Sequence, residues 1–156
     1  MRETPEIIPY SNIYKDSFKA LNEEWITKYF VMEEMDIISL NNPKEYILDK
    51  GGYIAVALLK KEPVGVCALL KSNRKGFDFE LAKMGVSRKA QGKGIGKLLA
   101  IHIIEKAKSL GAKKIYLESN SVLIPAIRLY EKLGFTSISG ASSPYERSDI
   151  QMELVL

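Results

Sequence analysis

The chain has 156 residues and a net charge of +4, and its 46% share of hydrophobic residues is typical of a soluble globular protein. The length predicts one domain over residues 1–156, and the modest, interspersed charge does not indicate a nucleic-acid partner. No apolar run approaches the roughly 20 residues that cross a bilayer and no signal peptide is recognisable, so we expect a cytoplasmic protein that binds no membrane.

The N-terminal third predicts one short strand and three helical segments. EIIPY, residues 6–10, has the composition of the strand. From Asn12, apolar residues recur every three to four positions, as in an amphipathic helix, at Tyr14, Phe18, Leu21, Trp25 and Tyr29. Two shorter helical segments are expected around 32–40 and 43–49, the second with Pro43 in its first turn.

The rest of the chain alternates between strands and helices. The segments predict three strands, a helix, a strand, a helix and two strands, over residues 53–59, 64–70, 77–86, 95–110, 112–120, 125–134, 135–139 and 146–156. The first two of these strands are joined by KKEP, which predicts a hairpin turn. The order predicts an α/β (α+β) fold, a mixed sheet with helices on its faces.

Cysteine and histidine occur once each. Cys67 lies in the apolar run VGVCALL with nothing basic beside it, so we expect a buried, unreactive thiol. His102 lies in the helical run IGKLLAIHIIEKA, where we expect a structural or partly exposed residue. These counts exclude an internal disulfide and leave no ligand set for a cysteine or histidine metal centre, so we expect no metal.

The segment RKAQGKGIGKLLA, residues 88–100, has three glycines at alternate positions where a helix begins. The glycine spacing fits neither a Walker loop nor a dinucleotide fingerprint. A helix N-terminus offers unpaired N–H groups, and glycines let an anion approach them closely. The segment therefore predicts a diphosphate site, with long-range attraction from Arg88, Lys89, Lys93 and Lys97; the alternative is a flexible charged turn before a surface helix.

Residues 91–96, QGKGIG, match the Q/R-x-x-G-x-G/A signature of the GCN5-related N-acetyltransferases (GNAT), which bind acetyl-CoA. ELAKMGV resembles the fourth strand of that family, YLESN the fifth, and AIRLYEKLGF the helix and strand that follow, in the family's order. The resemblance is strong over residues 53–138. It implies a mixed sheet of six to seven strands flanked by helices, with a splay between the fourth and fifth strands.

The resemblance implies acetyl-CoA as the cosubstrate. Backbone N–H groups of the glycine segment would hold the diphosphate, the pantetheine arm would follow the fourth strand, and the N–H of Met84 would polarise the thioester carbonyl. The implied cofactor-binding residues are Met84, Gly85, Val86, Gln91, Gly92, Lys93, Gly94, Ile95, Gly96, Lys97, Asn120 and Pro125. Asn120 departs from the pattern because the loop SVLIP before Ala126 is longer than in many relatives, and a turn or N-cap role is its alternative.

Tyr130 and Glu80 are the catalytic residues that the resemblance implies. Tyr130, in LYEKLGF, matches the tyrosine that protonates the departing thiolate; the alternative is that it only packs on its helix. Glu80 lies four residues before Met84, where some family members carry a glutamate that deprotonates the amine through water. Its alternative is a solvated carboxylate paired with Lys83 or Arg74.

The acceptor is expected to bind the first helices and the last hairpin. Trp25 and Tyr29, with Phe30, are candidates for a pocket wall, although an apolar stripe also suits the core. In SSPYERSDI, Arg147 is a candidate fork for a substrate carboxylate with Tyr145 covering it, and a polar hairpin edge is the alternative.

The C-terminal pattern and the helix LNEEWITKYF resemble the acetyltransferase half of MarR–GNAT fusion proteins, which favours a small amine or amino acid. We therefore expect an acetyl-CoA-dependent N-acetyltransferase that acts on the primary amine of a small molecule by direct transfer in a ternary complex. A protein N-terminal or lysine acetyltransferase and a non-catalytic acetyl-CoA sensor are the alternatives. Dimers are common in the family, which leaves a homodimer open.

Overall fold

The computed structural model describes residues 4–139 and 143–156, which form a sheet flanked by four α-helices. The strands are β1 (Glu6–Pro9), β2 (Tyr53–Leu59), β3 (Glu62–Lys71), β4 (Phe79–Val86), β5 (Lys114–Ser119), β6 (Thr136–Ile138) and β7 (Ile150–Val155). The helices are α1 (Lys15–Tyr29), α2 (Glu34–Asn41), α3 (Ile95–Ser109) and α4 (Ile124–Lys132), with short 3-10 turns at Asn12–Tyr14 and Arg88–Ala90 and one π-helical turn at Lys44–Leu48. Within these described ranges, no helix has the length and apolarity needed to cross a membrane.

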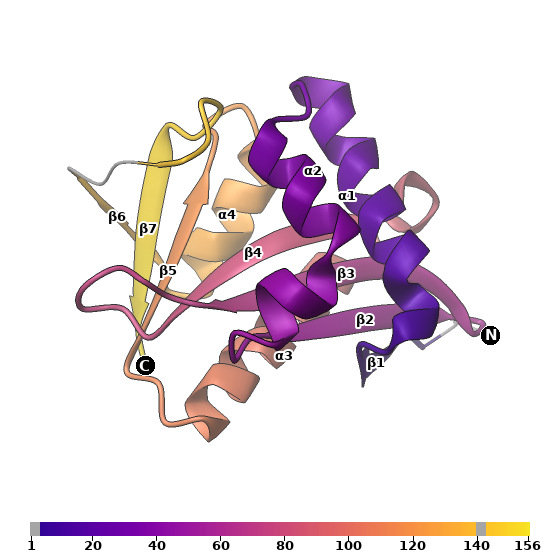
Figure 1. The fold of residues 1–156 in the computed structure, drawn as a ribbon, viewed down its shortest axis with the longest axis horizontal. Helices are drawn as coiled ribbons and strands as arrows, with labels where there is room; N and C mark the ends of the chain where they lie inside the picture. The colour runs from indigo at the N-terminus through magenta and orange to yellow at the C-terminus, as the bar shows by residue number, and fades with distance from the viewer. Residues whose placement is uncertain (1–3, 140–142) are drawn as a thin grey trace.

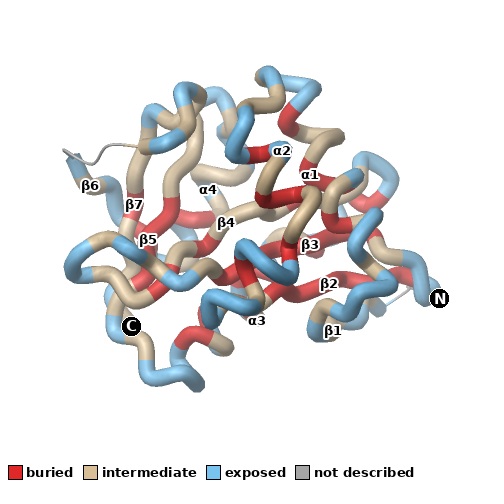
Figure 2. The backbone as a smooth tube through the Cα atoms, viewed as in Figure 1, coloured by how far each residue is buried: buried red, intermediate tan, exposed pale blue. Residues whose placement is uncertain are grey.

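The strands form one sheet in the order β1-β2-β3-β4-β5-β7-β6, in which β4 and β5 are the parallel pair. Helices α1 and α2 cover one face and α3 and α4 the other (Figure 1). Each face has its own hydrophobic core, one around Ile103 and Leu117 and one around Phe18 and Leu40. Figure 2 shows the buried backbone concentrated in the central strands. The predicted mixed sheet with helices on its faces is confirmed.

The first hairpin is tighter than predicted. Glu62 and Pro63 belong to β3, so the turn consists of Lys60 and Lys61 alone, with φ values of 48° and 66°. Two central residues with positive φ suit a two-residue turn whose twist matches that of the flanking strands. Pro63 lies opposite Leu58, next to an irregularity in the register, where a strand tolerates a residue that has no N–H to donate.

Strands β4 and β5 part soon after they meet. Their pairing consists of Phe79 with Ile115 and Glu80 with Tyr116, and both strands then continue without further pairing to each other. The edges of β4 after Glu80 and of β5 after Tyr116 are therefore open toward each other. The predicted splay between the fourth and fifth strands is confirmed, and it creates the opening that the candidate site uses.

A β-bulge interrupts β4 at its middle. Ala68 pairs with Ala82 and Val66 with Gly85, so one residue of β3 faces both Lys83 and Met84. Lys83 has φ of 55°, a left-handed conformation that is uncommon for a residue with a side chain. A bulge of this kind redirects side chains and often lies next to active sites.

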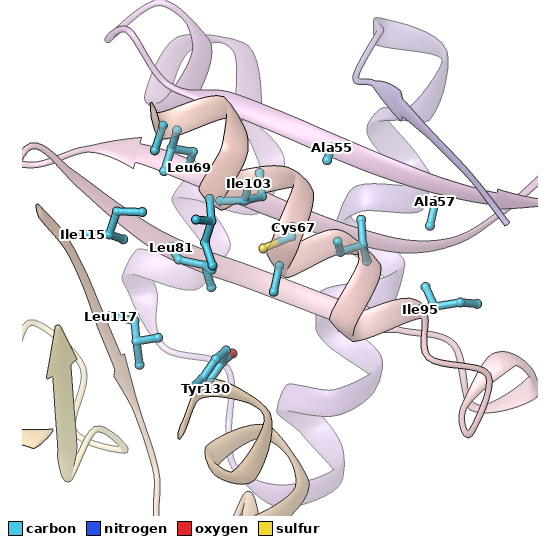
Figure 3. Packing of buried hydrophobic residues seen from close by; sticks show 14 of the residues in the cluster. Ala55, Ala57, Cys67, Leu69, Leu81, Ile95, Ile103, Ile115, Leu117 and Tyr130 are labelled. Atoms are coloured by element: carbon cyan, nitrogen blue, oxygen red, sulfur yellow. The ribbon is translucent and has the colours of Figure 1, made fainter. Parts of the chain in front are cut away.

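The core on the α3 side contains both Cys67 and Tyr130. Cys67 is fully buried, and burial raises the pKa of its thiol. Figure 3 shows this cluster, with Cys67 beside α3 and Tyr130 near Leu117 of β5. The buried position agrees with the prediction of an unreactive thiol.

Candidate active site

A pocket of about 270 Å³ opens where β4 and β5 part. Many of the residues that the sequence predicted for the site line it together: Trp25, Tyr29, Glu80, Met84, Gly85, Val86, Asn120, Pro125, Tyr130, Tyr145 and Arg147. They come from α1, β4, the loop after β5, α4 and the segment before β7, which are far apart in the sequence. The fold therefore brings the predicted catalytic and acceptor residues to one place.

The glycine segment lies at the N-terminus of α3, beside the β4 wall of this pocket. Gly94 is the N-cap with φ of 75°, and Gly92 has φ of 80°. A Cβ on Gly96 would lie 3.6 Å from Met84 Sδ, which shows how closely the helix start approaches the pocket lining. Lys93 and Lys97 are exposed.

The backbone donors at this helix start are available to a ligand. The first helical bond is donated by Leu98 N to Gly94 O at 3.1 Å. The preceding N–H groups of Ile95, Gly96 and Lys97 have no acceptor in the part of the chain that the structure describes. Unpaired N–H groups at a helix start, with exposed lysines around them, fit the charge and donor requirements of a diphosphate.

Glu80 is the last residue of β4 that pairs with β5, where it lies opposite Tyr116, and it lines the pocket. Burial, and next the negative charge of Glu118, raise the pKa of Glu80 to about 7, against smaller lowering effects of Lys83 and Arg74. Those two cations pair with other carboxylates, Lys83 with Asp36 at 3.5 Å and Arg74 with Glu118 at 3.6 Å. A carboxylate with this pKa exchanges a proton readily near neutral pH.

Tyr130 both packs in the core and lines the pocket. Its side chain packs edge-to-face on Phe135, with ring centroids 5.8 Å apart. Burial, and next the Cys67 thiol, raise the pKa of the Tyr130 phenol, so the phenol keeps its proton at neutral pH.

Arg147 binds a carboxylate of the protein itself. Its guanidinium donates to both oxygens of Asp36, Nη1 to Oδ2 at 2.5 Å and Nη2 to Oδ1 at 2.6 Å, and Nη1 also lies 3.4 Å from Glu33 Oε2. Asp36 is fully buried and accepts a further bond from the backbone N–H of Glu33 at 2.9 Å. Burial alone would raise the pKa of Asp36, but the bonds from Arg147 and Glu33 and the charge of Lys83 lower it below its ordinary value.

Lys83 joins this network from β4. Its Nζ donates to the Tyr145 hydroxyl at 2.8 Å and lies 3.5 Å from Asp36 Oδ1, and its side chain is 7% exposed. Both Tyr145 and Trp25 stack against the Arg147 guanidinium, at 4.5 and 5.6 Å from the ring centroids. The acceptor side of the pocket is thus lined by aromatic and charged side chains that are connected to one another by hydrogen bonds, ion pairs and stacking.

Asn120 and Pro125 both line the pocket, at the turn that leads into α4. Helix α4 begins at Ile124, so Pro125 belongs to its first turn, where a missing N–H costs nothing, and the loop is shorter than expected. The Asn120 side chain accepts from Val122 N at 2.8 Å and donates to the Arg147 carbonyl at 2.7 Å. Its amide thus stabilises a turn and the segment before β7 while lining the pocket.

The packing of α1 against β4 requires glycine at position 85. A Cβ at this position would lie 2.5 Å from Leu21 O and 3.2 Å from Trp25 Cδ1, so only glycine lets α1 approach β4 this closely. Trp25 is held there by a bond from its Nε1 to Asn22 Oδ1 at 3.2 Å. Tyr29, at the end of α1, is 47% exposed and forms the outer rim of the pocket.

The sequence analysis did not single out Asp36, Lys83 or Glu118 as site residues. Strict alternation along β4 would put Lys83 on the face of Leu81, inside the core under α3, and a lysine there was the one available signal of an irregular strand. Asp36 gave no such signal, because its partner Arg147 is 111 residues away. No group of three or more His, Cys, Asp or Glu side chains in residues 4–139 and 143–156 could hold a metal ion.

Comparison with known proteins identifies the family to which the chain belongs. Residues 11–135 match the model of the acetyltransferase (GNAT) family. The chain is 35% identical over 106 residues to "Uncharacterized N-acetyltransferase YvbK" of Bacillus subtilis, covering 66% of this chain and 67% of that protein. It is 33% identical over 100 residues to N-acetylaspartate synthetase of Rattus norvegicus, but this match covers 64% of the chain and only 33% of the synthetase.

A solved structure extends the similarity over the whole fold. The Bacillus subtilis acetyltransferase in complex with CoA superposes with a TM-score of 0.69 at 26% identity, covering 99% of both chains. The match to the family model spans the glycine segment, the splayed strands and α4. The chain therefore belongs to the acetyltransferase (GNAT) family and is an N-acetyltransferase.

Proposed function

We propose that this acetyltransferase moves the acetyl group of acetyl-CoA to the primary amine of a small molecule, an amino acid or another amine, by direct transfer in a ternary complex. The observation that carries the proposal is that Glu80, Met84 and Tyr130 line a single pocket at the splay of β4 and β5. The N-terminus of α3 lies directly beside that pocket. The solved relative whose complex contains CoA supports the choice of cosubstrate.

The residues present fit acetyl-CoA, which supplies the acetyl group as a thioester. The unpaired N–H groups of Ile95, Gly96 and Lys97 would hold the diphosphate, and exposed Lys93 would add attraction. The open edge of β4, from Met84 to Val86, would pair with the pantetheine arm. The Met84 N–H would stabilise negative charge that develops on the thioester oxygen, an effect worth about 3 kcal/mol in other acyl transfers.

Two residues would move the protons. Glu80, half ionised near neutral pH, would accept a proton from the ammonium of the acceptor, directly or through water. The freed amine nitrogen forms the C–N bond as the C–S bond breaks. Tyr130, which keeps its proton at neutral pH, would then protonate the departing sulfur, so that the products are an amide and free thiol.

The pocket favours a small acceptor. Its volume of about 270 Å³ is slightly below the roughly 300 Å³ at which small-molecule sites usually begin. Trp25 and Tyr145 both stack against Arg147 on the acceptor side, which favours a closed pocket over the open groove that a protein substrate needs. The similarity to N-acetylaspartate synthetase, a relative named for an amino-acid product, supports an amino acid among small amines.

The direct test measures thiol released from acetyl-CoA with a panel of amino acids, polyamines, aminoglycosides and peptides. We expect strong transfer to a subset of the small amines, with N-acetylation verified by mass spectrometry. Transfer only to peptides would replace the small acceptor with a protein N-terminus or lysine. Tight acetyl-CoA binding with no transfer to any acceptor would favour the sensor alternative.

A further inference from the structure

The bulge in β4 turns Lys83 from the α3 face of the sheet to the α2 face, where the acceptor side of the pocket lies. Ala82 pairs with Ala68, which belongs to the core under α1 and α2, and Lys83 also reaches α2, through Asp36. Two consecutive residues therefore lie on the same face of the strand. Met84, the next residue, packs back on the α3 side. The left-handed conformation of Lys83, with φ of 55°, is what permits this change of face.

The two cations of the pocket lining differ in how far their charge is compensated. Arg147 holds Asp36 with two short bonds, so its fork is occupied. Lys83 lies 3.5 Å from the same carboxylate, well beyond the usual ~2.7–2.9 Å of a charge-assisted bond. Its short bond, 2.8 Å, goes to the Tyr145 hydroxyl, which is neutral. Lys83 is thus a nearly buried ammonium whose closest partner carries no charge.

An ammonium has three N–H donors, and the Tyr145 hydroxyl and Asp36 together account for two of them. Tyr145, which accepts from Lys83, keeps its own O–H free to donate. Lys83 and Tyr145 both line the pocket. A carboxylate between them would receive one charged and one neutral donor, and it would give Lys83 a second negative partner that could lie closer than Asp36 does at 3.5 Å.

We propose that Lys83, with the Tyr145 hydroxyl, binds a carboxylate of the acceptor, so that the acetyl acceptor is an amino acid. This inference rests on the proposed function and moves the carboxylate-binding role from Arg147 to Lys83. The acceptor's ammonium would face Glu80, three residues earlier on β4, whose pKa responds to the charge of Lys83. An amine and a carboxylate on one small molecule match this arrangement of opposite charges along one strand.

The test compares each of the twenty amino acids as the free acid and with every carboxylate amidated, which keeps the size and removes the negative charge. For the best acceptor, we expect kcat/KM of the wild-type protein to be at least tenfold higher for the acid than for the amide. In Lys83→Met, KM for the acid should rise roughly 10- to 100-fold, the worth of a bond to a charged group. The acid-to-amide ratio should then fall to near one.

Lys132→Met, on the exposed end of α4, is the matched control, and its ratio should stay at the wild-type value. A second readout does not depend on turnover: calorimetric binding of the N-acetylated acid to the protein should weaken by a similar factor in Lys83→Met. Lys83→Arg, which keeps the charge, should retain part of the preference for the acid. This variant serves as the test if Lys83→Met does not fold.

The outcomes separate this inference from the proposed function. Transfer to amides or other small amines as efficiently as to acids overturns the carboxylate site and leaves the small-amine acetyltransferase intact. An acid preference that survives in Lys83→Met also overturns it. No transfer to any small amine overturns both.

Discussion

The two ends of the proposed site are built from different parts of the chain. The cofactor end is backbone: Gly92 and Gly94 are exposed, have positive φ and would offer a Cβ nothing within 4 Å to meet. The acceptor end is side chains: Asp36 is fully buried, and Arg147 and Lys83 converge on it. The cofactor end should therefore tolerate substitutions at every position except its glycines. The acceptor end should lose stability when any one of its charged side chains loses its partner.

Removing the central carboxylate of the acceptor end should have the largest effect. Asp36→Ala leaves two largely buried cations without their shared partner, which should cost about 3–5 kcal/mol of unfolding free energy. Because the pKa of Asp36 is lowered on folding, its contribution exists above the unfolded value near 3.8 and is lost as the pH falls further. Urea unfolding at pH 7 and at pH 3 measures both effects.

Asp49→Ala provides the matched control. Asp49 pairs with Lys44 at 3.0 Å, but both side chains are more than half exposed, so its loss should cost far less stability than the loss of Asp36. Equal destabilisation by the two substitutions would show that the acceptor end does not depend on buried charge. The contrast drawn between the two ends would then be wrong.

The cofactor end is tested by Gly94→Val, which should weaken acetyl-CoA binding about 1,000-fold by calorimetry. Valine strains the left-handed N-cap and covers the N–H groups that follow, each worth about 1.5–3 kcal/mol to an anion. Gly76→Val tests a position with a similar positive φ, 88°, and the same open space around a Cβ, in a turn away from the site. It should lose stability but keep its affinity for acetyl-CoA. If both variants bind alike, the diphosphate lies elsewhere.

The sequence predicted the end that depends on local spacing better than the end that depends on distant contacts. The glycine segment needs only the end of a strand, a turn and a helix start close together in the sequence, and the structure has them between Val86 and Ala100. The network of Asp36, Lys83 and Arg147 needs α2, β4 and the segment before β7 to meet. It also needs a bulge that no local propensity specifies. Arg147 was predicted as a substrate ligand because its buried partner could not be found from spacing alone.

Tyr130→Phe separates proton transfer from packing where the two ends meet. The ring stays in the core against Phe135, so stability and acetyl-CoA affinity should change little, while kcat should fall about 100-fold through loss of the acid. Tyr53→Phe removes a hydroxyl that bonds His102 at 2.8 Å outside the pocket and should leave kcat unchanged. Stopped-flow measurement of thiol release decides. An unchanged kcat in Tyr130→Phe would reduce the residue to packing.

Glu80→Gln should have the smallest effect on rate, because a water molecule in the pocket can accept the proton of the ammonium instead. We expect about a tenfold loss of kcat/KM at pH 8. In the wild-type protein, kcat/KM should rise through an apparent pKa of about 7 as Glu80 loses its proton, and this limb should disappear in the variant. Glu131→Gln, an exposed carboxylate on α4, should keep the wild-type profile.

The raised pKa of Glu80 predicts the opposite pH dependence for stability, which should fall where kcat/KM rises. The folded state holds the Glu80 proton up to about pH 7, whereas the unfolded chain releases it near 4.5, so wild-type stability should fall as the pH rises through that window. Glu80→Gln removes the titration and should gain on the order of 2 kcal/mol relative to wild type at pH 8, and almost nothing at pH 4. A loss of rate together with a gain of stability at high pH would identify Glu80 as a carboxylate kept in an unfavourable place for its chemistry. If Glu80→Gln lost both rate and stability, Glu80 would be a structural residue. The reaction centre would then depend on paired charges in the same way as the acceptor end.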